Sequence, residues 1–189
     1  MNDILNGTLV RLSAVDPEEF SKAFTSWRRD SEFMRLMDSG PIRLGSQKDT
    51  QKWIEKDLDE QELHQHSFTI RTLAEDKLIG DIGLWVVNWP GRDAFVGLGI
   101  GERDFWGRGY GTDVMKLILR YAFMEVNLCR VTLTVFEYNP RAIRSYEKVG
   151  FATKGGCVEH CIATAGATMS YSWAFCVEEW LEKNAELMS

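Results

Sequence analysis

The chain has 189 residues, 44% of them hydrophobic and 26% charged, which is long enough for a substantial core and is ordinary for a soluble globular protein. Its 22 Lys and Arg residues against 28 Asp and Glu residues give a formal net charge of −6, which argues against non-specific binding to nucleic acid. The N-terminus has no basic-then-apolar signal, and no apolar run approaches the roughly 18 residues of a membrane span. We expect one cytoplasmic domain over residues 1–189.

The four cysteines form no disulfide framework, and we expect them to be reduced. Cys157, His160 and Cys161 suggest a metal site, but two further ligands at zinc-like spacing are missing. On a strand, the two cysteines would share one face and His160 would lie on the other. The sequence therefore predicts no metal.

In chain order, the first predicted helix begins with Asp16 as its cap and Pro17 in its first turn. A loop is expected around residues 38–41. The turn at Glu75 and Asp76 joins two alternating strands, and a further apolar strand follows a loop at residues 88–92. The remaining elements predicted in this half are strand Thr8–Leu12, helix Ser46–Leu63, and strands Phe68–Leu73, Leu78–Val87 and Phe95–Ile100.

In the second half, Asn139 is a good helix cap, Pro140 suits the first helical position and Gly150 suits the end. The other elements predicted here are helix Gly111–Val126 and strands Val131–Phe136, Ala152–Glu159 and Thr168–Val177. Adjacent pairs of strands are incompatible with a regular βα alternation. The expected fold class is α+β, with a mixed, mainly antiparallel central sheet flanked by helices.

The most informative segment is Trp106–Thr112, in which Gly107, Gly109 and Gly111 alternate with other residues between a strand and a helix. Such a turn exposes backbone N–H groups at the positive end of a helix dipole, so it favours phosphate over a turn without a ligand. Residues 102–154 carry nine Lys and Arg against six Asp and Glu, a net +3, which leaves −9 for the remainder. An anionic ligand is consistent with that excess.

Two nucleotide motifs fit the turn poorly. A P-loop requires Lys and Ser or Thr after its glycines, and neither follows here. The dinucleotide fingerprint requires Gly-x-Gly-x-x-Gly at the start of a fold, whereas this Gly-x-Gly-x-Gly turn lies in mid-chain; Glu137 is the residue that could imitate its ribose-binding acid.

Residues 103–151 instead resemble the acyl-CoA-binding core of the GNAT superfamily of N-acetyltransferases. The resemblance rests on the turn Trp106–Thr112 and on the helix motif Asn139–Phe151, in which Asn139, Ala142, Tyr146, Gly150 and Phe151 fall at family spacing. Within the superfamily, residues 9–12, 104–107 and 179–180 are most similar to the branch that acetylates the N-terminal residue of ribosomal proteins.

The resemblance implies a GNAT fold that uses acetyl-CoA as co-substrate, without a metal. Its implied roles are diphosphate binding by the backbone of the turn, alignment of the strand before it with the pantetheine amides, and a hydrogen bond to the pantetheine arm from Asn139. The residues concerned are Leu98, Gly99, Ile100, Gly107, Arg108, Gly109, Gly111, Thr112 and Asn139. Where the superfamily usually has Gln or Arg, this chain has Trp106.

Acetyl transfer requires a deprotonated amine, a stabilised oxyanion and a protonated leaving thiolate. Tyr146 is the candidate acid, because a phenol with a pKa near 10 is close to balance with a thiol near 8.5; a purely structural tyrosine is the alternative. The backbone N–H near Leu98 or Gly99 is the candidate oxyanion donor. Glu102 is the candidate base, although it could equally be a solvated turn residue, and His64 and His66 are expected to be surface residues.

The absence of a strong base favours acceptors that are already partly neutral. An α-amine with a pKa near 7.7–8.0 is easier to deprotonate than a lysine near 10.4, by on the order of 3.4 kcal/mol. The sequence therefore predicts direct ternary-complex transfer to an amine acceptor that is a protein N-terminus. The alternatives are a small-molecule acceptor (a polyamine, an aminoglycoside or an amino acid) and a non-catalytic acyl-CoA sensor. No nucleic-acid or membrane partner is expected, and the protein is expected to be a monomer or homodimer.

Overall fold

The computed structural model describes residues 3–38, 40–59, 64–163 and 166–185. For residues 153–163 and 166–172 it describes the backbone but not the side chains. Its strands are β1 (Val10–Ser13), β2 (Gln65–Thr72), β3 (Leu78–Asn88), β4 (Asp93–Ile100), β5 (Arg130–Phe136), β6 (Ala152–Ala163) and β7 (Gly166–Cys176). They form one seven-stranded sheet in the order β1-β2-β3-β4-β5-β7-β6. Within it β4 and β5 are parallel, and every other neighbouring pair is antiparallel.

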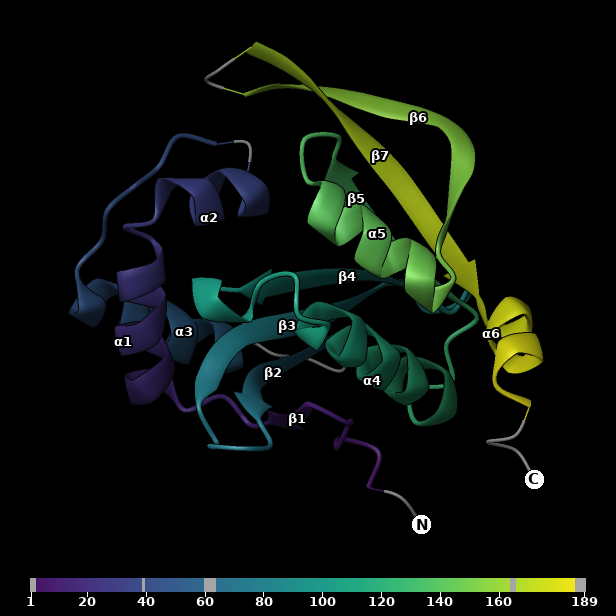
Figure 1. Ribbon diagram of the computed structural model, residues 1–189, viewed down its shortest axis with the longest axis horizontal. Coiled ribbons are helices and arrows are strands. Elements are labelled where there is room, and N and C mark those ends of the chain that lie inside the picture. The colour runs from purple at the N-terminus through teal and green to yellow at the C-terminus, as the bar shows by residue number, and fades with distance from the viewer. Residues whose placement is uncertain (1–2, 39, 60–63, 164–165, 186–189) are drawn as a thin grey trace.

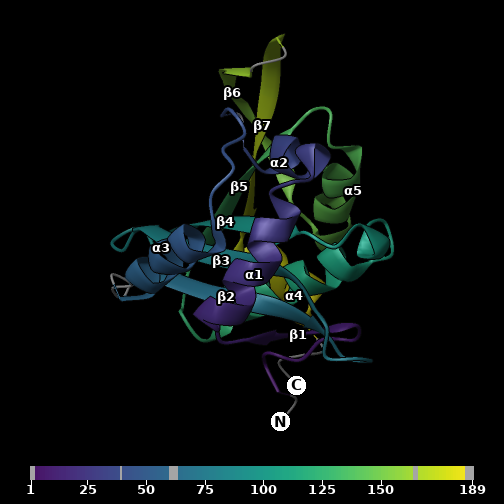
Figure 2. The same cartoon turned by 90° about the vertical axis from the view of Figure 1, so that its left-hand side faces the viewer.

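The helices are α1 (Pro17–Trp27), α2 (Ser31–Met37), α3 (Gln47–Asp59), α4 (Tyr110–Met124), α5 (Pro140–Val149) and α6 (Val177–Lys183), with a short 3₁₀ turn at Arg103–Phe105. Figures 1 and 2 show α1, α2 and α3 gathered on one side of the molecule and α4 and α5 on another, while β6 and β7 project beyond the rest. No helix that the structure describes is long and apolar enough to cross a bilayer.

Two apolar clusters hold these elements together. The larger one joins α4 to the sheet through fully buried side chains such as Ile82, Val114 and Ile118. The smaller one joins α1, α2 and α3 through Phe20, Phe33 and Ile54. Two separately packed groups of helices thus cover the sheet.

A buried carboxylate ties the N-terminal segment to the start of α4. Asp113 is 7% exposed and accepts hydrogen bonds from the backbone N–H groups of Thr8, Leu9 and Val10, at 2.9, 2.8 and 3.1 Å. The Thr8 hydroxyl donates a further bond at 2.9 Å. Because several donors converge on one charged acceptor, this contact fixes the position of the helix that follows the glycine turn.

The predicted fold class is confirmed, and so are the local signals at the helix ends. Asp16 caps α1 by accepting from the N–H of Glu19 at 2.8 Å, and Asn139 caps α5. Two short helices were not predicted, α2 and α6; the latter begins at Val177, which the sequence assigned to the last strand. The predicted end of helix Ser46–Leu63, at residues 60–63, lies outside the described residues.

Among the described residues, no three His, Cys, Asp or Glu side chains gather as metal ligands would. Cys157, His160 and Cys161 fall in the stretch whose side chains are not described, so the expectation that they bind no metal stays a prediction.

Candidate active site

The glycine turn has the backbone conformation that the sequence suggested. Gly107 and Gly109 have φ angles of +73° and +92°, in the region that L side chains rarely adopt, and Gly109 is the residue from which α4 begins. In the first turn of an α-helix the N–H groups have no intrahelical acceptor, which leaves those of Tyr110, Gly111 and Thr112 directed out of the helix end. The turn therefore offers an anion-binding surface made of main chain.

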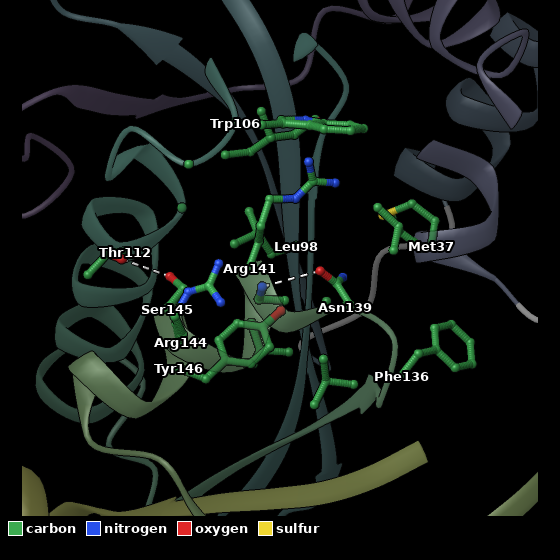
Figure 3. Close-up of a pocket in the computed structure, with 18 of the residues that line it drawn as sticks. Met37, Leu98, Trp106, Thr112, Phe136, Asn139, Arg141, Arg144, Ser145 and Tyr146 are labelled. Atoms are coloured by element: carbon green, nitrogen blue, oxygen red, sulfur yellow. Dashed lines mark hydrogen bonds between the residues drawn. The ribbon is translucent and has the colours of Figure 1, made fainter. Parts of the chain in front are cut away.

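Strand β4 separates from its parallel neighbour soon after the two strands pair. The ladder joins Asp93, Ala94 and Phe95 to residues 130–132 and goes no further. The opening beyond it is occupied by a cavity of about 450 Å³, which we call the main cavity. Its walls are residues 95–98 and 100 of β4, residues 134–136 of β5, α5, the glycine turn and the end of α2. Figure 3 shows Thr112 and Met37 on opposite sides of it.

Most of the predicted coenzyme-binding residues meet at this cavity. Those that line it are Leu98, Ile100, Gly107, Gly109, Gly111, Thr112 and Asn139. Two do not. Gly99 is not among the lining residues, and a Cβ atom on it would meet Met37 and Asp81; Arg108 is an exposed turn residue. For each of these nine residues, contact with the coenzyme stays a prediction.

Asn139 has a structural role in addition to the predicted one. Its side-chain oxygen accepts the backbone N–H of Ala142 at 3.2 Å, as the cap of α5. The amide nitrogen is the group that Asn139 would use to donate to a pantetheine arm in the main cavity.

Cationic side chains from α5 line the main cavity beside the turn: Arg141, Arg144 and Lys148. The guanidinium of Arg141 lies 4.1 Å from the centre of the Trp106 ring, and Arg103 lies 5.1 Å from it. Trp106 also donates its indole N–H to the carbonyl of Ile100 at 2.6 Å. The tryptophan that departs from the family pattern therefore serves to hold the turn against the end of β4 and to orient a cation at the cavity (Figure 3).

Tyr146 lies on the cavity side of α5 and is 8% exposed. Its ring packs 6.0 Å from the ring of Phe151. Burial raises the pKa of the phenol to about 12. Proton transfer from the Tyr146 phenol to a thiolate is therefore further from balance than the sequence suggested. Tyr146 is suited to donate a hydrogen bond to the leaving sulfur, and its catalytic role stays a prediction.

Glu102, the predicted base, does not line the main cavity. It accepts from the indole N–H of Trp27 at 2.9 Å and pairs with Lys77 at 2.7 Å. Partial burial opposes ionisation of this carboxyl, but the hydrogen bonds from Lys77 and Trp27 outweigh it and lower its pKa. A carboxylate with a lowered pKa and two donors already bound is a weak base, so these contacts argue for a structural role.

Sequence reasoning missed the wall contributed by α2, which consists of Phe33, Leu36 and Met37, and the adjacent Asp38. Of the aromatic residues nearby, Phe105 lines the main cavity, Trp85 lines a smaller cavity beside α1 and α3, and Trp89 donates its indole N–H to His64 at 2.6 Å. The helix motif did contain Arg141, Arg144 and Lys148, and their spacing along one helix was the signal that could have identified a cationic wall.

Comparison with known proteins assigns the family. Residues 10–152 match the family described as "Acetyltransferase (GNAT) domain". The uncharacterized, SPbeta prophage-derived N-acetyltransferase YokL of Bacillus subtilis is 28% identical over 161 residues, covering 85% of each chain. The spermidine N(1)-acetyltransferase of Vibrio cholerae is 33% identical over 86 residues, covering 46% of this chain and 49% of that protein.

The fold is that of solved acetyltransferases. The crystal structure of spermidine N-acetyltransferase from Vibrio cholerae in complex with CoA and spermine matches with a TM-score of 0.78 at 20% identity, covering 91% of this chain and 98% of the other. These relatives give no support to the expected branch specific for ribosomal proteins. The chain belongs to the GNAT acetyltransferases, and acetyl-CoA is the co-substrate from which it transfers an acetyl group to an amine.

Proposed function

We propose that the acceptor is a small primary amine carrying additional positive charge, of the polyamine class, rather than a protein N-terminus. The observation that carries this proposal is the polarity of the main cavity. Arg141, Arg144 and Lys148 line its α5 wall, where an anionic coenzyme would lie, and Asp38 lies at its α2 end. Coenzyme and acceptor of opposite charge would each meet a complementary wall.

The relatives support the same acceptor class. Both the Vibrio cholerae protein similar in sequence and the solved structure similar in fold are spermidine acetyltransferases. The sequence-based preference for a protein N-terminus depended on the absence of a base, and it has no independent support. A peptide acceptor is thus the second candidate.

In the proposed reaction the diphosphate of acetyl-CoA lies on the amides of the glycine turn, and the thioester lies in the opening between β4 and β5. The neutral amine attacks the thioester carbon, a C–N bond forms and the C–S bond breaks. Tyr146 donates a hydrogen bond to the departing sulfur. The backbone beside Leu98 is the candidate donor to the oxyanion.

An acceptor panel read by release of free CoA thiol tests the proposal. It should contain spermidine, spermine, a monoamine of matched length, an aminoglycoside, a free amino acid and peptides with a free α-amine. We expect the highest kcat/KM for the polyamines. Higher values for the peptides would refute the acceptor class, and release with none of these amines would favour the acyl-CoA sensor.

A variant of the α2 end gives a second test. Asp38→Asn should raise KM for spermidine several-fold and leave KM for the matched monoamine nearly unchanged, because it removes attraction for the second charge only. Equal effects on both amines would mean that Asp38 does not recognise the acceptor.

The assembly state expected from the sequence, a monomer or homodimer, stays a prediction, as does the cytoplasmic location. Light scattering at several protein concentrations checks the former.

A further inference from the structure

Asp81 stands out in the middle of β3. Its neighbours Ile79, Ile82 and Leu84 are almost completely buried and apolar. The Oδ1 atom of Asp81 is itself buried and has no hydrogen-bond partner among the described residues. Leaving a carboxylate buried without a donor is costly, so a position of this kind calls for a functional explanation.

The register of the sheet places this carboxyl beside the predicted reaction centre. Asp81 is directly opposite Gly99 of β4. A Cβ atom on Gly99 would lie 3.2 Å from Asp81 Oδ1 and 3.0 Å from Met37 Cε. The bare glycine therefore allows the carboxyl and the thioether to lie together over the strand that is predicted to hold the thioester.

Asp81 lines one cavity and lies near a residue that lines a second. Met37, its neighbour over Gly99, lines the main cavity. Asp81 itself lines a smaller cavity of about 120 Å³ between α1, α3 and the β2–β3 hairpin, which we call the side cavity. A flexible methionine thus lies between the carboxyl and the main cavity, on the α2 side.

The surroundings of the carboxyl suit an organic cation. The side cavity is lined by the rings of Phe20, Trp53, Phe68 and Trp85. The acidic group that shares the side cavity with Asp81 is Asp57 of α3, while Asp38, after α2, lines the main cavity. From β2, Gln65 and Ser67 face it as neutral groups, and no Lys or Arg of the described chain lines the side cavity. Aromatic faces and carboxylates together attract an ammonium group.

We propose that Asp81 is the base that accepts the proton of the acceptor's ammonium group, beside Met37 of the main cavity. This inference rests on the proposed function and names the residue that makes a strongly basic amine reactive. The Asp81 carboxylate takes one proton from R–NH3⁺, and the resulting R–NH2 attacks the acetyl carbon. As the C–N bond forms and the C–S bond breaks, the sulfur leaves with the electron pair of the C–S bond and takes up the second proton that the attacking nitrogen loses, which gives CoA thiol and the neutral amide. Asp81 returns its own proton to solvent after the product leaves.

Burial, through desolvation, raises the pKa of the Asp81 carboxyl to about 7. A base is most effective when its pKa lies near the working pH, because it is then both ionised and basic enough. Glu102, with its lowered pKa and its two donors, meets neither the geometric nor the acid–base requirement.

The test is the pH dependence of kcat/KM for Asp81→Asn against the full-length wild-type protein, with whichever amine of the panel is acetylated fastest. The wild type should show a rise controlled by a group with an apparent pKa near 7. The variant should lose about 100-fold or more in kcat/KM at neutral pH, in the range that general bases contribute. It should also lose the limb near pH 7, with acetyl-CoA affinity unchanged by calorimetry.

Asp76→Asn is the matched control. Asp76 lies in the β2–β3 turn, outside both cavities, and pairs with Arg11 on the surface. Its φ of +54° is one that asparagine tolerates. This variant should keep the activity and the pH profile of the wild type.

The failure of each proposal has its own signature. If Asp81→Asn keeps the limb near pH 7 and most of its activity, or if Glu102→Gln removes that limb instead, Asp81 is not the base, and the acceptor class is unaffected. If polyamines are not acetylated but another amine is, the acceptor class fails, and the comparison of pH profiles still decides on Asp81. If no amine is acetylated, a ¹³C NMR titration in which the Asp81 carboxyl titrates near pH 4 overturns the proposal.

Discussion

Replacing Asp81 by asparagine should change how the stability of the protein depends on pH. The carboxyl has a raised pKa of about 7 in the folded chain, against an ordinary value of 3.8. A group whose folded pKa is raised contributes stability that is fully present below its unfolded pKa and is lost as the pH rises through its folded pKa. Wild-type stability should therefore fall between about pH 4 and pH 7, because over this range the carboxyl ionises in the unfolded chain and stays protonated in the folded one.

The difference between the two pKa values corresponds to about 4 kcal/mol, at roughly 1.36 kcal/mol for each pH unit. Between about pH 5 and pH 8, the part that is easily measured, the loss amounts to about 2.6 kcal/mol. Asparagine does not titrate, so Asp81→Asn should lack this component, and the other titrating groups cancel when the two proteins are compared.

Urea unfolding of wild type and Asp81→Asn at several pH values measures the difference directly. The free energy of unfolding of the variant should gain on that of the wild type as the pH rises, by the amount given above. A difference that stays constant from about pH 5 to pH 8 would show that Asp81 titrates in its ordinary range, and the reasoning from its burial would be wrong.

Three further outcomes follow from the site and the fold. Tyr146→Phe should lower kcat at least tenfold and leave the Kd of acetyl-CoA within about twofold by calorimetry, since the ring packing is kept; unchanged turnover would exclude Tyr146 from the reaction. Gly109→Ala places a side chain at a φ of +92°, which costs about 1–2 kcal/mol, so the affinity for acetyl-CoA or the free energy of unfolding should fall by that amount. Gly109→Asp should weaken acetyl-CoA binding far more, because its negative charge repels the diphosphate. Asp113→Ala should lower the free energy of unfolding by about 2–4 kcal/mol, because it leaves the N–H groups of Thr8, Leu9 and Val10 without their acceptor; a loss below about 0.5 kcal/mol in urea unfolding would contradict this.

Local chemistry explains why the coenzyme side could be predicted. Glycines at positive φ, as at Gly109, and an Asn-Pro helix start, as at Asn139, are constraints on single residues and their near neighbours. They are visible in the sequence because few other residues satisfy them. The positions of the strands along the chain followed from alternation and turn residues in the same way.

The proposed acceptor side depends on contacts between segments far apart in the chain, and these were not predictable. Helix α2 has seven residues, fewer than two turns, which is too short to show helical periodicity. The environment of Asp81 depends on the pairing of β3 with β4 and on Met37, which belongs to helix α2. The one hint in the sequence was a lone carboxylate within an apolar strand. Glu102 attracted attention through its position after β4, but its partners Trp27 and Lys77 come from other elements.

The central claim is that one cavity, opened by the separation of β4 from β5, receives acetyl-CoA with its diphosphate on the glycine turn. A crystal structure of the protein with CoA tests it most directly. The account predicts the diphosphate within hydrogen-bond distance of the N–H groups around Gly109 and Gly111, and the thiol in the main cavity beside Tyr146. A coenzyme that binds elsewhere, with this turn free of phosphate, would contradict the account.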